Sequence, residues 1–229
     1  VLTGIHLGKY GEDLANGLTL ADAVRSAAEV SGLERLRLSS IKADEVAEDL
    51  LDAMQAPTVC PHLHLPLQSG DDTVLRRMER GYTAERFMDT VRLARSMLDR
   101  PAITTDVMAG FPGETEEMFE NTVEVCEQAR FSRMHVFPFS ARAGTKAAEM
   151  DGQLHSKTKK KRCGRLRELA DRLAADWAES FVGQEVGVLF ERSRDGVLDG
   201  YTDRYVPVRA EGDEEVVGRT VTVGCESSD

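Results

Sequence analysis

The chain has 229 residues, of which 41% are hydrophobic and 30% are charged, and its formal net charge is -11 at pH 7. These values are ordinary for a globular protein and leave room for one large domain and a small one. The acidic balance opposes attraction of the whole surface to nucleic acid, so any RNA contact requires a local basic patch.

No segment directs the protein to a membrane. No apolar stretch approaches the roughly 20 residues of a membrane span, and residues 1–6 lack the charged-then-apolar order of a signal peptide. We therefore expect a cytoplasmic monomer with no membrane contact. Val1 begins inside a strand-like segment, and from this we expect a fragment whose N-terminal portion is absent.

Strand-like and helix-like segments alternate through the first 155 residues. Apolar segments near residues 1, 36, 64, 105 and 136 are typical of strands. Apolar residues at helical spacing predict helices between them, at residues 19–30, 43–54, 71–78, 83–98 and 115–129. This alternation favours βα units with parallel pairing. We predict an α/β fold with a partial TIM-like (βα) barrel.

The pattern changes after residue 155. Residues 156–181 predict one long, highly charged helix, and the chain then becomes all-β, with strands expected at residues 185–191, 197–201, 205–209 and 220–223. Short strands at this spacing are typical of a small oligonucleotide-binding barrel. We therefore expect a barrel domain (1–155), a basic linking helix (156–180) and a small β-barrel (181–229).

The four cysteines show no CxxC or CxxxCxxC spacing; they are Cys60, Cys126, Cys163 and Cys225. A metal or iron–sulfur site needs thiolates close together, usually from short local loops. We predict isolated reduced thiols and no metal ligands in this chain.

Two segments, residues 62–72 and 106–115, carry the strongest functional signal. Each is a strand that ends in a polar, glycine-containing turn and leads into a helix. In barrels and open parallel sheets, ligands bind where such turns meet at the C-terminal ends of the strands.

These two segments and three others resemble the radical-SAM methylthiotransferases in order and spacing; the five are residues 2–8, 36–41, 64–70, 106–115 and 135–145. The tail from residue 181 to 223 is similar to a TRAM domain, a small RNA-contacting β-barrel. Within the family, the turn after Leu2 and the segment from His135 to Ser140 are most similar to the branch that acts on tRNA threonylcarbamoyladenosine.

The resemblance implies transfer of a methylthio group to C2 of N6-threonylcarbamoyladenosine next to the anticodon. The implied cofactors are S-adenosylmethionine and 4Fe–4S clusters. One departure is large, because the family binds its radical-generating cluster through a CxxxCxxC loop and an auxiliary cluster through an N-terminal domain, and this sequence has neither. We expect no catalytic residue in this fragment and no activity from it alone.

The resemblance also implies which residues contact S-adenosylmethionine. They lie in the turns that follow successive strands and are Thr3, Gly4, Ser39, Ser40, Gln68, Ser69, Gly110 and Phe111. Each has a plainer interpretation: Ser40 could cap a helix, and the turn at Gly110 could simply be a stiff βα connection. His64 could point into the barrel, but we assign it no acid–base role.

The expected partner is a tRNA anticodon stem-loop. Basic candidates for phosphate contact lie in the loop after residue 139, in the charged helix and in the tail; they are Arg142, Lys157, Lys159, Lys160, Lys161, Arg162, Arg165, Arg192, Arg204 and Arg209. Arginine suits this task because its guanidinium can pair with phosphate through two hydrogen bonds. The alternative is a merely solvated helical face.

Three other functions compete with this one. The chain could be a non-catalytic RNA-binding remnant, or its substrate could be a ribosomal protein. A metabolic TIM-barrel enzyme is disfavoured by the lack of paired carboxylates or metal ligands and by the attached small β domain.

Overall fold

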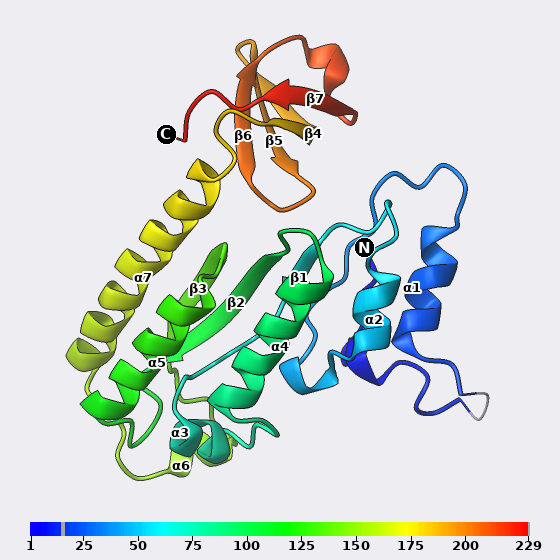
Figure 1. Cartoon of the computed structure of the whole chain (residues 1–229). Helices are drawn as coiled ribbons and strands as arrows, with labels where there is room; N and C mark the ends of the chain where they lie inside the picture. Colours follow the sequence, from blue (N-terminus) through cyan, green and yellow to red (C-terminus); the bar gives the residue numbers. More distant parts are fainter. Residues whose placement is uncertain (15–16, 229) are drawn as a thin grey trace.

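The computed structural model describes residues 1–14 and 17–228. Its centre is a parallel sheet of three strands in the order β1-β2-β3 (Figure 1). They are β1 (His62–His64), β2 (Ala102–Ala109) and β3 (Arg133–Pro138). Leu63 pairs with Ile103, and Val107 pairs with Val136. The predicted α/β class and the parallel pairing are confirmed.

The strands predicted near residues 1 and 36 are wrong in extent, because each segment forms only isolated parallel bridges. Leu2 pairs with Leu38, and Leu36 pairs with Val59. Pro61 follows the second bridge and has no N–H to extend the ladder, and a short 3-10 helix (Leu7–Lys9) soon follows the first. The five parallel segments nevertheless lie side by side in chain order.

Side-chain caps begin most of the helices at the predicted places. Thr19 forms a capping box with Asp22 at α1 (Leu20–Ala28). The N-caps of three further helices also accept backbone hydrogen bonds; these helices are α3 (Asp72–Arg77), α4 (Ala84–Met97) and α5 (Glu116–Ala129). A four-residue α6 (Lys146–Glu149) follows β3.

The helix predicted over residues 43–54 is two elements. A 3-10 turn (Ala43–Glu45) is separated from α2 (Glu48–Ala53) by extended backbone at Val46 and Ala47. Val46 is buried in the core. Turning this side chain inward in an extended segment interrupts the helix that periodicity alone predicts.

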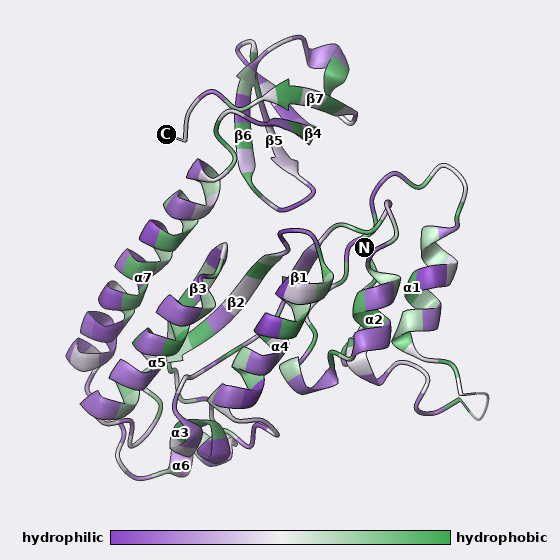
Figure 2. Cartoon of the chain, in the orientation of Figure 1, coloured by the Kyte–Doolittle hydropathy of each residue, from purple (hydrophilic) through white to green (hydrophobic). Residues whose placement is uncertain are grey.

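The charged helix α7 (Ser156–Glu179) packs along β3 and belongs to the main core. Cys163, Leu166, Leu169 and Leu173 form its buried stripe. Figure 2 shows hydrophobic and hydrophilic residues alternating along this helix, as an amphipathic helix requires. Among the described helices, none is both long enough and apolar enough to cross a bilayer.

The tail is an antiparallel sheet in the order β6-β5-β4-β7. Its strands are β4 (Glu185–Arg194), β5 (Val197–Thr202), β6 (Pro207–Glu211) and β7 (Thr220–Gly224). Val188, Phe190 and Leu198 form a small core. The predicted barrel closure is absent from the described residues, because no hydrogen bonds join the edge strands β6 and β7, and four strands of this length form an open sheet rather than a closed one.

The tail docks against the N-terminal ends of the parallel segments (Figure 1). Arg35 donates to the carbonyls of Tyr201 and Gly187 at 3.0 and 2.9 Å. Arg37 donates to the carbonyls of Asp203 and Thr202, also within 2.9 Å. The opposite, C-terminal ends of the strands therefore remain uncovered by the tail.

Candidate functional site

The turns that follow the parallel segments meet along one edge, which we name the C-terminal edge. Backbone hydrogen bonds hold the turns side by side: Ser39 N donates to Leu2 O at 2.9 Å, Gln68 N to Asp106 O at 2.8 Å, and Phe139 N to Ala109 O at 2.8 Å. The structure thus brings together the turns predicted to bind S-adenosylmethionine.

A polar surface leads to this edge on one face of the sheet. Asp106 lies 3.4 Å from Nε2 of His64 and 3.9 Å from Nδ1 of His135. The hydrogen bond from His64 lowers the pKa of the Asp106 carboxyl, against a raising effect of burial. A carboxylate held between two imidazoles can orient a polar ligand or hold a proton. We name these three residues the polar face.

The sequence analysis considered His64 but missed Asp106 and His135. The signal was the period-two alternation of β2, in which Ile103 and Val107 are fully buried while Asp106 is partly open. Residues paired in register on neighbouring strands point to the same face of the sheet, and Asp106 pairs with His135 across β2 and β3.

The first two pairs of predicted cofactor residues lie at the open side of the C-terminal edge. Thr3, Gly4 and Ser40 are exposed. The hydroxyl of Ser39 is buried and has no hydrogen-bond partner among the described residues. Since buried polar atoms are normally satisfied, this hydroxyl is suited to a polar group of a ligand.

The next two predicted cofactor residues, Gln68 and Ser69, differ in whether their side chains are available to a ligand. Gln68 has a φ of 64°, its backbone is held by β2 on both sides, and its side-chain amide makes no hydrogen bond within the described residues. Ser69 is 0% exposed, and its hydroxyl contacts that of Thr122 and accepts from Asp71 N–H. The prediction that Ser69 contacts a ligand is wrong, because its side chain faces α5.

Gly110 and Phe111 form a tightly packed turn. The Gly110 N–H donates to the Glu114 carboxylate, and Phe111 packs edge-on against Phe139 at 5.3 Å. Phe111 is 4% exposed, and a Cβ on Gly110 would lie 2.3 Å from the Lys159 side chain. The plainer interpretation, a stiff βα turn, describes the local packing, while the turn still lies at the C-terminal edge.

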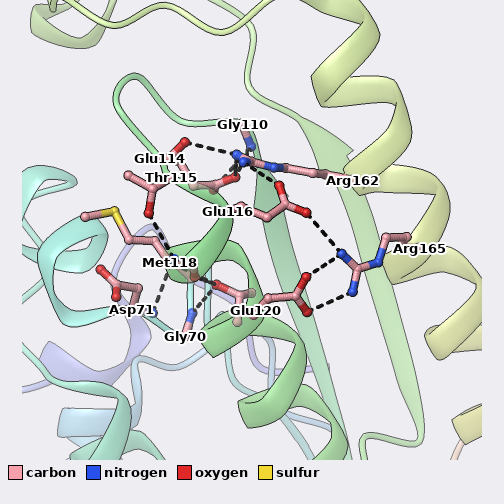
Figure 3. A network of polar contacts seen from close by, with 12 residues as sticks. Gly70, Asp71, Gly110, Glu114, Thr115, Glu116, Met118, Glu120, Arg162 and Arg165 are labelled. Carbon is pink, nitrogen blue, oxygen red and sulfur yellow. Dashed lines mark hydrogen bonds and ion pairs between the residues drawn. The ribbon is translucent and has the colours of Figure 1, made fainter.

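Figure 3 shows that Arg162 and Arg165 bind carboxylates of the protein itself. Arg162 is 4% exposed and pairs with Glu114 at 2.5 Å and Glu116 at 2.9 Å. Burial raises the pKa of Glu114, and the Arg162 charge opposes that rise. The prediction that Arg162 contacts phosphate is wrong, because the guanidinium has been taken out of solvent.

Arg165 forms two hydrogen bonds with Glu120 at 2.6 and 2.8 Å. The hydrogen bond with this carboxylate raises the pKa of the Arg165 guanidinium. Both terminal nitrogens of the Arg165 guanidinium are therefore occupied by a carboxylate, which argues against the phosphate contact predicted for this residue. Lys159 is partly buried and donates to the Phe139 carbonyl at 3.0 Å, so it also stabilises the fold.

The other basic residues predicted to contact RNA from α7 make no ion pair among the described residues. Lys157, Lys160 and Lys161 are exposed at its first turns. Arg142 is exposed in the loop before α6. Within the described residues, none of these four side chains makes an ion pair. The beginning of α7 lies at the same end of the molecule as α3 and α6 (Figure 1).

The tail arginines lie at the other end. Arg204 binds Asp99 and Asp203 and the carbonyls of Asp99 and Arg100. It therefore fastens the tail, and the prediction that it contacts phosphate is wrong. Arg209 pairs with Asp199 on the tail surface, while Arg192 is exposed. The structure does not bring these three residues near the C-terminal edge.

No cluster site exists among the described residues, since no three cysteine, histidine or acidic side chains group as metal ligands. Cys60, Cys126 and Cys163 are buried and free, and Cys225 is half-buried. Burial raises the pKa of all four thiols, and a raised pKa opposes the thiolate form that binds iron. The residues present do not fit an iron–sulfur cluster.

Residues 11–126 match the model of the radical SAM superfamily. The chain is 38% identical over 229 residues to a threonylcarbamoyladenosine tRNA methylthiotransferase of Bacillus subtilis, and 42% identical over 208 residues to that of Thermotoga maritima. The alignments cover 97% and 90% of this chain but 51% and 48% of those proteins.

A tRNA-2-methylthio-N(6)-dimethylallyladenosine synthase of Acetivibrio thermocellus is 35% identical over 226 residues, which cover 97% of this chain and 47% of the synthase. The chain thus spans about half the length of the curated relatives it matches. Among solved structures, coproporphyrinogen III oxidase from Escherichia coli, described as a radical SAM enzyme, has a TM-score of 0.52 at 13% identity over 82% of this chain and 51% of its own. That likeness supports the fold alone.

Proposed function

Because the chain belongs to the radical-SAM methylthiotransferase family, we propose that it is part of the enzyme that methylthiolates C2 of N6-threonylcarbamoyladenosine next to the tRNA anticodon. The observation that carries the proposal is the alignment of nearly the whole chain with a threonylcarbamoyladenosine tRNA methylthiotransferase. The supporting geometry is the meeting of all the predicted cofactor turns at one edge of the parallel sheet.

S-adenosylmethionine fits the C-terminal edge. The exposed backbone of Thr3 and Gly4, the unpartnered hydroxyl of Ser39 and the amide of Gln68 are the groups that would hold it. Glycine suits such a contact because it lets a ligand approach the main chain closely. When bound, this cofactor supplies the methyl group of the reaction.

The polar face orients what lies beside that edge. Nε2 of His64 lies 3.4 Å from one oxygen of the Asp106 carboxylate, and Nδ1 of His135 lies 3.9 Å from the other. These groups can bind the polar edge of a base or hold a proton near it. The radical-generating cluster has no ligands among the described residues, so we expect this chain alone to be inactive.

RNA contact in this proposal uses the basic residues at the same end of the molecule, namely Arg142, Lys157, Lys160 and Lys161. Their exposure and lack of internal ion pairs support this part of the proposal. A local patch is needed because the protein as a whole is acidic.

The test is the nucleoside content of tRNA in a strain that lacks the gene encoding this chain. Digested tRNA, analysed by liquid chromatography and mass spectrometry, should lose 2-methylthio-N6-threonylcarbamoyladenosine and accumulate its precursor. Restoring the gene should restore the modified nucleoside.

Other outcomes select the alternatives. Loss of the methylthiolated dimethylallyladenosine would move the enzyme to that branch, to which several relatives belong. Loss of methylthiolation on a ribosomal protein, with tRNA unchanged, would establish the protein substrate. A strain with every methylthio group intact would leave the RNA-binding remnant.

A further inference from the structure

A shallow cavity of about 330 Å³ opens between the end of α3 and the start of α4, and none of the predicted cofactor residues lines it. Three arginines line it, namely Arg76, Arg80 and Arg86. We name this cavity the arginine cavity. The lining also includes Asp72, Tyr82 and Thr83.

The three guanidinium groups have no internal partner. Within the part of the chain that the structure describes, none of them forms a hydrogen bond or an ion pair. The one carboxylate of the lining, Asp72, instead accepts the N–H of Ala84 at 2.8 Å. Several other arginines of the molecule are paired, for example Arg92 with Asp89 and Arg172 with Glu127.

This absence of pairing has a physical cost. The protein holds 40 acidic and 29 basic side chains, so carboxylates are plentiful, yet three like charges converge on one open cavity. Positive charges around one cavity repel one another, and an anion bound between them would offset this repulsion. Arg162, which stabilises the fold, is paired with a carboxylate, whereas these three arginines are not paired within the described part of the chain.

The cavity adjoins the candidate site. Tyr82, in its lining, donates its hydroxyl hydrogen to the Pro66 carbonyl at 2.6 Å, directly under the turn that carries Gln68. Lys146 of α6 pairs with Glu79, the neighbour of Arg80, at 2.6 Å. The loop that carries Arg142 therefore lies beside the cavity, and Figure 1 shows α3 and α6 together at this end.

We propose that the arginine cavity binds a phosphodiester group of the RNA substrate, an inference that rests on the RNA-modifying function proposed above. A guanidinium fork matches phosphate oxygens in a way that a point charge does not. An open, shallow site suits the phosphate of a polymer, and the free cations of residue 142 and of the first turns of α7 continue the basic surface at the same end.

The experiment measures binding of the complete chain to a fluorescently labelled anticodon stem-loop as salt is raised from about 50 to 200 mM. The test variant is R76Q/R80Q/R86Q. The control variant, R92Q/R172Q/R194Q, removes the same charge from exposed arginines outside the cavity. Circular dichroism checks that both variants remain folded.

The test variant should bind the stem-loop at least ~10-fold more weakly than the control at low salt. The slope of log affinity against log salt should fall in magnitude by about 0.7 to 0.9, the contribution of one phosphate contact. A second variant, R76K/R80K/R86K, keeps the charge and should retain most of the slope while losing part of the affinity.

Equal affinity and slope in the test and control variants would overturn the cavity proposal, and so would failure of the wild-type chain to bind the stem-loop. The result is separable from the function itself. Nucleoside analysis decides which adenosine is modified, whereas the salt slope decides only whether these arginines contact phosphate.

Discussion

At the scale of single residues, burial decides which cations serve the fold. Arg162 and Glu114 form an ion pair whose side chains are 5% and 2% exposed. We expect Arg162→Met to lower the free energy of unfolding by about 3–5 kcal/mol, because Glu114 keeps a buried charge without its partner. Urea unfolding measures the change.

The matched control for this variant is Arg172→Met, which removes an exposed pair with Glu127. That loss should cost about 0–1 kcal/mol. The double variant Glu114→Gln with Arg162→Met should recover part of the lost stability, because neither buried charge then remains. A single Arg162 variant no less stable than the Arg172 variant would contradict the buried pair.

His62 makes stability depend on pH. Burial lowers its pKa from 6.5 to about 3, and the Arg37 charge adds to the effect. Below pH 6.5 the unfolded chain therefore binds a proton that the folded chain refuses, so this histidine's contribution to stability is lost as pH falls toward 3. Relative to His62→Gln, the wild type should lose about 2 kcal/mol between pH 7 and pH 5.

Denaturant unfolding of both proteins at several pH values measures this difference. Above pH 7 the gap between them should be constant, because His62 is neutral in both states there. Parallel stability curves from pH 7 down to pH 5 would show that the His62 ring is protonated in the folded protein as easily as in the unfolded chain.

At the scale of elements, two glycines test how closely the helices approach the sheet. A Cβ at Gly70 would lie 2.6 Å from the Cα of Thr122 in α5, whereas at Gly164 in α7 it would meet nothing within 4 Å. We expect Gly70→Ala to lower the free energy of unfolding by roughly 1–3 kcal/mol through overpacking. Gly164→Ala should raise the free energy of unfolding by about 0.5–1 kcal/mol, because alanine has a higher helix propensity than glycine.

Thermal unfolding monitored by circular dichroism measures both glycine variants. Their shifts in melting temperature should have opposite signs. Equal shifts would mean that α5 does not press on the turn at Gly70, and that this turn is free to move away from the helix.

Local patterns were sufficient for most elements. The helices predicted to begin at residues 83 and 115 do begin there, and Thr83 and Thr115 are their N-caps. The lengths of the strands were harder to predict, because strand pairing depends on residues that are distant in the chain. Leu36 and Leu38 alternate as a strand would, yet only single bridges form there. The break at Val46 likewise reflects burial in the core.

The candidate site was predictable in outline and not in its side chains. That the turns meet follows from parallel pairing, which the βα alternation indicates. The fate of Ser69 and Arg162 depends on Thr122 and Glu114, which lie more than forty residues away. A cluster of basic residues in the sequence does not show which of those residues face carboxylates of a neighbouring helix.

At the scale of the whole molecule, the candidate functional site and the docking contacts of the tail lie at opposite ends of the parallel sheet. The free cations, the arginine cavity and the turns lie at the C-terminal edge, while paired arginines fasten the tail at the other end. The RNA contact that we propose at the C-terminal edge would therefore not involve the docking contacts of the tail.

The docking of the tail depends on a few arginines and one aromatic ring. Arg37 lies 3.8 Å from the ring centre of Tyr205, and that ring packs against His62 at 4.7 Å. Each hydrogen bond from a charged donor contributes about 1.5–3 kcal/mol. We expect Arg35→Ala with Arg37→Ala to speed amide hydrogen exchange at least ~10-fold in residues 202–206, with no change in β2. An Arg194→Ala control, at an exposed pair in the tail, should leave exchange as in the wild type. Unchanged exchange in the double variant would mean that the contacts of Arg204 and the packing of Tyr205 hold the tail in place without Arg35 and Arg37.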